Sequence, residues 1–156
     1  MHLSIESPRQ PDVLQLIEDL DAYQKPLYPA ESHHGIDIEA LSHPSVIFVV
    51  IRDDANVAVA CGAVVVNEEY GELKRMYVRP EYRGRGLAKR LLTFLEAKGL
   101  ERGCPAFALE TGIYQPEAHR LYESAGYIRC EPFGDYQPDP MSVFMWKDAE
   151  VSQMKG

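Results

Sequence analysis

Long apolar runs are the feature that this 156-residue sequence most clearly lacks. The longest covers residues 46–51, which is far too short to span a bilayer. The first ten residues have neither the basic start nor the apolar core of a secretory or transit peptide. We therefore expect no membrane partner and a cytoplasmic location.

Cysteine is also scarce, with three residues in the whole chain. Cys61, Cys104 and Cys130 are odd in number and show no metal-site spacing, so they predict neither a disulfide framework nor a zinc site. Cys61 lies inside an apolar run, where a small buried thiol is a more common role than a nucleophile. We expect reduced cysteines and no metal.

Basic residues are fewer than acidic ones, 16 against 24, and the net charge of −8 disfavours nucleic acid as a partner. The basic residues nevertheless concentrate between Lys74 and Arg90, where seven of them stand against Glu81 alone. A cationic island in an acidic protein attracts a polyphosphate locally. The alternative is an ordinary solvated helix face, and charge by itself leaves both interpretations open.

The length suits a single domain over residues 1–156, and no repeat, linker or low-complexity segment divides it. Segments rich in strand formers predict strands, and apolar residues at helical spacing predict helices. The expected strands cover residues 3–6, 45–52, 57–67, 69–78, 106–110, 127–130 and 142–146. The expected helices cover residues 8–20, 36–41, 86 onward and 116–125, with a loop at 25–35.

One turn between a strand and a helix is the most informative segment. Residues 78–92 read VRPEYRGRGLAKRLL, in which Pro80 ends a strand and an amphipathic helix follows. Gly84 and Gly86 allow the backbone to approach a ligand closely, and the first N–H groups of the helix have no partner within it. Such a turn is typical of a phosphate site.

Two motifs then identify a family. Residues 83–88 match the pattern R/Q-x-x-G-x-G/A, and a later segment matches N-x-x-A-x-x-L-Y-x-x-x-G-F/Y with glutamine in place of asparagine. The second match is carried by Gln115, Ala118, Leu121, Tyr122, Gly126 and Tyr127. In order and spacing the two motifs resemble the GCN5-related N-acetyltransferase (GNAT) superfamily, and LETG at residues 109–112 resembles a group of its bacterial members. The resemblance implies an α/β (α+β) GNAT fold, with a mixed, mostly antiparallel sheet of six to seven strands and about four flanking helices.

The resemblance implies acetyl-CoA as the donor substrate and no metal. Backbone N–H groups of the turn would hold the pyrophosphate, and the strand before it would pair with the pantetheine arm. The residues so implied are Arg83, Gly84, Arg85, Gly86, Leu87 and Ala88 at the pyrophosphate, Met76, Tyr77 and Val78 along the pantetheine, and Gln115 and Ala118 beside it. Gln115 keeps an amide donor but is one methylene longer than the usual asparagine.

Three residues are candidates for the chemistry. Tyr122 matches the tyrosine that protonates the departing CoA thiolate in many members, although its position in an apolar helical stripe is also typical of a core residue. Glu72 occupies the strand position of the catalytic glutamate in histone-type members, and a surface strand carboxylate is the alternative. Glu110 ends the next strand and is a second candidate base or a ligand for the acceptor. The choice between the two glutamates stays open.

We expect an N-acetyltransferase that moves the acetyl group to the amine of a small-molecule acceptor by direct attack in a ternary complex. The acidic background favours a cationic acceptor. A protein lysine or N-terminus is the alternative acceptor, and a CoA-binding sensor without turnover is the alternative outside enzymes. A dinucleotide-binding module fits poorly, because Lys89 stands at its third glycine position. Relatives are often homodimers. The candidates to line the acceptor pocket are Tyr28, Glu31, Arg75, Tyr114, Phe133 and Tyr136. His33 and His34 lie in a loop of the kind that contributes to acceptor pockets in the family, and ordinary surface histidines are the alternative.

Overall fold

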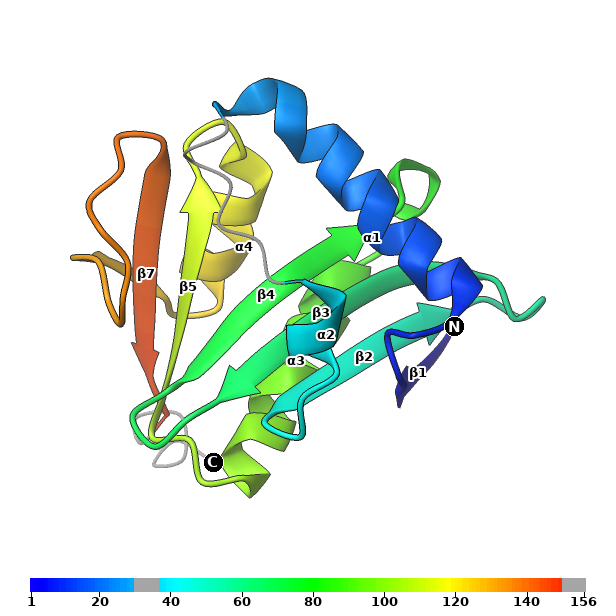
Figure 1. Cartoon of the computed structure of the whole chain (residues 1–156), viewed down its shortest axis with the longest axis horizontal. Helices are drawn as coiled ribbons and strands as arrows, with labels where there is room; N and C mark the ends of the chain where they lie inside the picture. Colours follow the sequence, from blue (N-terminus) through cyan, green and yellow to red (C-terminus); the bar gives the residue numbers. More distant parts are fainter. Residues whose placement is uncertain (30–36, 150–156) are drawn as a thin grey trace.

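A seven-stranded sheet forms the centre of the computed structural model, which describes residues 1–29 and 37–149 (Figure 1). Its strand order is β1-β2-β3-β4-β5-β7-β6. The strands are β1 His2–Ile5, β2 Val46–Arg52, β3 Ala58–Val66, β4 Gly71–Val78, β5 Ala106–Gly112, β6 Ile128–Cys130 and β7 Ser142–Asp148. Neighbours pair antiparallel except β4 and β5, which are parallel.

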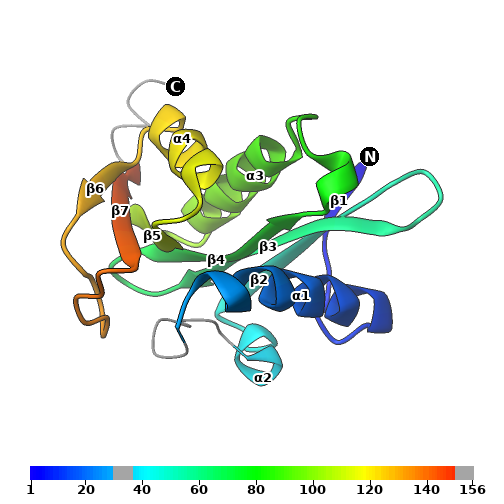
Figure 2. The same cartoon turned by 90° about the horizontal axis from the view of Figure 1, so that it is seen from above.

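Two helices cover each face of the sheet (Figure 2). The helices α1 Pro11–Gln24 and α2 Ile38–Leu41 lie on one face, and α3 Leu87–Glu101 and α4 Pro116–Ser124 lie on the other. Buried apolar side chains accordingly form two clusters, one on each face of the sheet. The mixed sheet with its four helices confirms the expected GNAT fold. Within the described residues, none of the helices is both long and apolar enough to cross a membrane.

Several boundaries differ from the expectation. The first helix begins at Pro11 and not at residue 8, because the side chain of Gln10 donates to the Ser7 carbonyl at 2.8 Å and fixes a turn there, and proline is favoured in a first helical turn. The helix ends at Gln24, four residues later than expected. The strand β5 runs to Gly112, two residues further than expected, because it pairs with β7 along its whole length.

The expected loop at residues 25–35 is described only at its start. Lys25–Leu27 form a single 3-10 turn, and the candidates Glu31, His33 and His34 lie outside the described residues. The short helix that follows begins at Ile38, and the Asp37 carboxylate caps it by accepting a hydrogen bond from a backbone N–H.

An irregularity in β4 positions the site. The register between β3 and β4 shifts by one residue between Cys61 and Ala63, and Arg75 opposite this shift has φ of 56°, in the left-handed region. The strands β4 and β5 pair only from Gly71 to Leu73 on the β4 side. Beyond Leu73 the two strands diverge, as Figure 1 shows, and their backbones no longer pair with each other.

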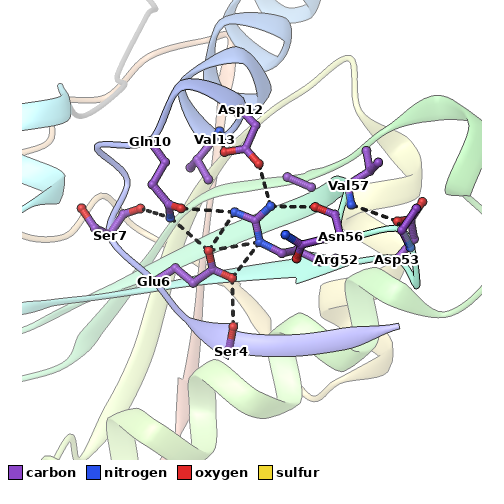
Figure 3. A network of polar contacts seen from close by, with 12 residues as sticks. Ser4, Glu6, Ser7, Gln10, Asp12, Val13, Arg52, Asp53, Asn56 and Val57 are labelled. Carbon is purple, nitrogen blue, oxygen red and sulfur yellow. Dashed lines mark hydrogen bonds and ion pairs between the residues drawn. The ribbon is translucent and has the colours of Figure 1, made fainter.

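Three arginines, Arg52, Arg75 and Arg79, form ion pairs with acidic residues of α1. Figure 3 shows the first, in which the Arg52 guanidinium binds Glu6 and Asp12 at 2.9 and 2.6 Å. Hydrogen bonds from Arg52 hold the pKa of both carboxyls below their ordinary values. Two further acidic residues of α1 pair with arginines of β4 and the residue after it, and these pairs are Asp21 with Arg75 and Asp19 with Arg79. The helix is thereby fixed across the open end of β4.

Candidate active site

A cavity of about 350 Å³ lies where β4 and β5 diverge. We call it the β4–β5 cavity. Both strands contribute to its wall, together with the end of α1, the start of α4 and the loop before β7. The lining residues with titratable or amide side chains are Asp21, Gln24, Lys25, Tyr28, Asp37, Glu72, Lys74, Arg75, Glu110, Gln115, Tyr122 and Tyr136. All three candidates for the chemistry therefore reach one cavity, although they come from three different elements.

The Glu72 carboxylate is held by two neighbours. The Tyr136 hydroxyl donates to Glu72 Oε2 at 2.6 Å, and Lys74 Nζ lies 3.3 Å from the same oxygen. Lys74 also donates to the Tyr136 hydroxyl at 2.7 Å. Burial first, and then the charge of Glu72, raise the pKa of Tyr136, so the phenol stays protonated and remains a donor. Glu72 is therefore a fixed carboxylate at the cavity wall and not a loose surface side chain.

Glu110 stands on the opposite strand of the same cavity. Its Oε2 accepts a hydrogen bond from the Ser142 hydroxyl at 2.7 Å. Ser142 begins β7 and pairs with Gly112 in the antiparallel ladder, so the sheet itself places the hydroxyl beside the carboxylate. The sequence did not indicate Ser142 or Lys74 as site residues. Each is recognised only by its contact with a candidate carboxylate, Ser142 with Glu110 and Lys74 with Glu72.

Tyr122 is both a buried core residue and a lining residue of the cavity. Its side chain is buried in the core beneath α4, and its ring meets Tyr127 edge to face at a centroid distance of 5.8 Å. It also lines the β4–β5 cavity. Burial raises the pKa of the Tyr122 phenol, so it carries its proton at neutral pH. A protonated phenol facing a cavity can donate to an anion that develops there.

The Tyr127 ring, which contacts Tyr122, is held in place by its own hydroxyl group. Its hydroxyl donates to Glu96 Oε2 at 2.7 Å, and Lys147 pairs with the same carboxylate at 3.1 Å. The two tyrosines therefore differ in their hydroxyl environment: that of Tyr127 is tied to α3, whereas within the described part of the chain we find no hydrogen bond for that of Tyr122.

The glycine-rich turn has the geometry that a phosphate site needs. Gly84 and Gly86 have φ of 79° and 77°, and a Cβ on either would meet open space. The helix α3 begins directly after them at Leu87, so its first N–H groups face the turn. The side chains of Arg83 and Arg85 lie over tyrosine rings and donate to the backbone carbonyls of Val78 and Glu81.

The cationic island is weaker than its sequence suggested. Lys74 pairs with Glu72, and Arg75 and Arg79 pair with carboxylates of α1. These three charges are therefore largely compensated, and the positive charge near the turn comes from Arg83, Arg85, Lys89 and Arg90. The charge count alone overestimated the field because it ignored acidic residues distant in the sequence.

The residues expected to bind the donor fall into two groups. Met76, Gln115 and Ala118 line the β4–β5 cavity. The residues outside its lining are Tyr77 and Val78, which continue β4, and Arg83, Gly84, Arg85, Gly86, Leu87 and Ala88, which form the turn and helix start beyond it. Met76 and the second group follow one another along β4 and the turn, whereas Gln115 and Ala118 come from the start of α4.

Metal ligands do not gather anywhere in the described residues 1–29 and 37–149: no group of three or more His, Cys, Asp or Glu side chains there could hold an ion. The three cysteines are free, with Cys61 and Cys104 buried. Burial raises the pKa of the Cys61 thiol to about 12, which suits a small core residue and not a nucleophile.

Comparison with known proteins gives one consistent family. A model described as the acetyltransferase (GNAT) family matches residues 13–127. An IAA acetyltransferase of Azospirillum brasilense is 46% identical over 144 residues, which cover 91% of this chain and 94% of that protein. The uncharacterized N-acetyltransferase YsnE of Bacillus subtilis is 34% identical over 151 residues, covering 94% of this chain and 99% of that protein.

Solved structures agree with the sequence matches. A protein of Klebsiella pneumoniae subsp. pneumoniae MGH 78578, described as an acyl-CoA N-acyltransferase, superposes with a TM-score of 0.80 at 39% identity, covering 94% of this chain and 96% of that one. An aminoglycoside 6'-N-acetyltransferase crystallised with coenzyme A superposes with a TM-score of 0.70 at 19% identity, covering 95% and 97%. The second likeness concerns the fold alone.

Proposed function

This chain belongs to the acetyltransferase (GNAT) family, and we propose that it transfers the acetyl group of acetyl-CoA to the amine of a small molecule within a ternary complex. One observation carries the proposal. Two carboxylates and a buried protonated phenol, Glu72, Glu110 and Tyr122, line one cavity at the opening between β4 and β5. These are the groups that amine acetylation needs, an acceptor for the ammonium proton and a donor for the leaving thiolate.

The donor lies, in this proposal, along the open side of β4 and ends at the glycine-rich turn. Pairing between β4 and β5 stops after Leu73, so the following backbone groups of β4 are placed to hydrogen-bond an extended pantetheine arm. The pyrophosphate then meets the N–H groups at the start of α3, where Gly84 and Gly86 leave room for it. The thioester reaches the cavity beside Met76 and Tyr122.

The proton must leave the acceptor before the reaction starts, because an alkylammonium has no lone pair. Glu72 and Glu110 receive the ammonium group, and one of them takes its proton. The neutral nitrogen attacks the thioester carbon, the C–S bond breaks, and Tyr122 gives its proton to the thiolate. The proton lost by the attacking nitrogen then restores Tyr122, so the products are the amide, CoA and one released proton.

The acceptor class follows from the cavity. Its volume of about 350 Å³ suits a small molecule, and among the described residues of its wall four carboxylates face three cations. An excess of negative charge favours an acceptor that arrives as an ammonium ion. A protein lysine or N-terminus is the second acceptor class, and a CoA-binding sensor of this fold is the alternative without turnover. A cytoplasmic location and a homodimer stay predictions.

A thiol-release assay tests the proposal. Acetyl-CoA is incubated with the protein and a panel of amines that includes polyamines, amino-acid derivatives and aminoglycosides, with IAA added because a relative is named for it. We expect CoA release that depends on the amine, together with the acetylated product. An acetylated peptide with no small-molecule product would favour the protein-directed alternative, and CoA binding with no product at all would favour the sensor.

A further inference from the structure

The wall of the β4–β5 cavity contains a residue that the two family motifs do not include. Tyr28 follows the 3-10 turn after α1, yet its side chain lies against the junction of β5 and α4, far away in the sequence. Its ring stacks on Tyr114 at a centroid distance of 5.6 Å. A Cβ on Gly112 would overlap the Tyr28 hydroxyl, so this contact requires glycine at the end of the LETG segment.

Within the described residues, the Tyr28 hydroxyl makes two hydrogen bonds of opposite sense. It accepts from the backbone N–H of Tyr114 at 3.1 Å and donates to Gln115 Oε1 at 3.2 Å. Burial is the main cause that raises the pKa of Tyr28, so the phenol keeps the proton that it donates. A phenol has a single proton, and here it is directed to the amide oxygen of Gln115.

The consequence concerns the other end of that amide. Gln115 stands at the N-cap position of α4, but its side chain makes no capping bond to the helix. With the oxygen bonded to Tyr28, the NH₂ group on the other arm of the planar amide is the part of the side chain that can donate, and Gln115 lines the cavity. The additional methylene that distinguishes glutamine from the usual asparagine is thus accommodated by a bond to Tyr28.

We propose that Tyr28 is a positioning residue for the donor, which fixes the Gln115 amide so that its NH₂ group donates to a carbonyl of the pantetheine arm. The proposal rests on the proposed function only in that CoA occupies the β4–β5 cavity. It adds a residue outside both motifs. It also explains why residue 112 is glycine, because a Cβ there would overlap Tyr28. A merely structural Tyr28 would support the β5–α4 junction without affecting what Gln115 binds.

A double-mutant cycle on CoA binding separates these roles, and calorimetry with CoA requires neither turnover nor a known acceptor. Tyr28→Phe keeps the ring and its stacking but removes the hydroxyl, and we expect CoA affinity to fall about five-fold, the effect of one well-placed hydrogen bond. In the Gln115→Ala background the same substitution should change affinity by less than about 1.5-fold. Equal losses in both backgrounds, or none in either, would overturn the proposal.

Two further variants keep the test decisive. Tyr114→Phe is the matched control, because it makes the same change in the stacked ring and retains the backbone N–H, so affinity should stay at the wild-type value. Gln115→Glu retains an oxygen for Tyr28 but has no N–H to donate, and it should weaken CoA binding even if Tyr28→Phe fails to fold; wild-type affinity in Gln115→Glu would contradict the proposal. If the unmodified protein bound no CoA, the proposed function itself would fail.

Discussion

The edge-to-face pair Tyr122 and Tyr127 allows catalysis to be separated from stability with one substitution made at two positions. Tyr→Phe removes a single hydroxyl and leaves each ring in its edge-to-face contact. In Tyr122 that hydroxyl belongs to a side chain lining the β4–β5 cavity, whereas in Tyr127 it is bonded to Glu96. We expect Tyr122→Phe to lose activity with little change in stability, and Tyr127→Phe to lose stability with little change in activity.

The magnitudes follow from these surroundings. Tyr122→Phe breaks no hydrogen bond within the described residues, so the free energy of unfolding should change by less than about 0.5 kcal/mol. Loss of a general acid should lower kcat by about 10²-fold, which corresponds to about 2.7 kcal/mol in the barrier. Tyr127→Phe removes a 2.7 Å donor from the partly buried Glu96 carboxylate and should cost about 1–3 kcal/mol of stability. Its kcat should stay within about two-fold of wild type, because the Tyr127 hydroxyl takes no part in the proposed proton transfers.

Urea denaturation measures the free energy of unfolding, and steady-state thiol release at saturating acetyl-CoA measures kcat. CoA affinity, taken by calorimetry, should be unchanged in Tyr122→Phe, which shows that the donor site is intact. An unchanged kcat in this variant would remove Tyr122 from the mechanism. An equal loss of kcat in both variants would mean that packing of the ring pair matters and that the hydroxyl does not.

Three further tests concern the donor site, the base and the α1 contacts. Gly86→Asp should weaken acetyl-CoA binding by roughly ten-fold or more in calorimetry, because it adds bulk and negative charge at the phosphate turn. The control is Gly103→Asp, at a glycine with similar φ and open space, and it should leave binding unchanged. Of Glu72→Gln and Glu110→Gln, the variant at the proton-accepting carboxylate should lose about 10²-fold in kcat/KM for the amine without losing CoA affinity; wild-type rates in both would place the base elsewhere. Glu6 and Asp12, which pair with Arg52, have pKa values below their ordinary values of 4.5 and 3.8, so the folded state binds fewer protons than the unfolded chain. The stability that they contribute is present above the ordinary pKa values and is lost as the pH falls through the pKa values of the folded state. Thermal denaturation between about pH 3 and pH 7 should therefore show a Tm that falls at acid pH, less steeply in Arg52→Gln; equal slopes would contradict this assignment.

Local patterns predicted most of the fold because they depend on neighbours in the sequence. The apolar spacing after Gly86 predicted α3, and the strand formers predicted all seven strands. The start of α1 was wrong by three residues, since Pro8 and Pro11 are both acceptable in a first helical turn and only the turn before Pro11 decides between them.

The arrangement of the site was predicted only in part, because contacts between distant segments decide it. The second motif predicted Tyr122 as a candidate, the positions of Glu72 and Glu110 on their strands predicted those two, and the structure brings all three to one cavity. No local pattern indicated that Tyr136 would cross the sheet to Glu72, or that Tyr28 would hold Gln115. The irregularity at Arg75 likewise depends on strand register, which propensity does not encode.

The central claim is that one cavity brings an amine to the thioester of acetyl-CoA. Its most direct test is mass spectrometry of the amine panel after incubation with acetyl-CoA and wild-type protein, with Tyr122→Phe in parallel. We expect at least one small amine to be acetylated by the wild type, and about 10²-fold more slowly by the variant. Acetylation of no amine by a protein that binds acetyl-CoA would contradict the account.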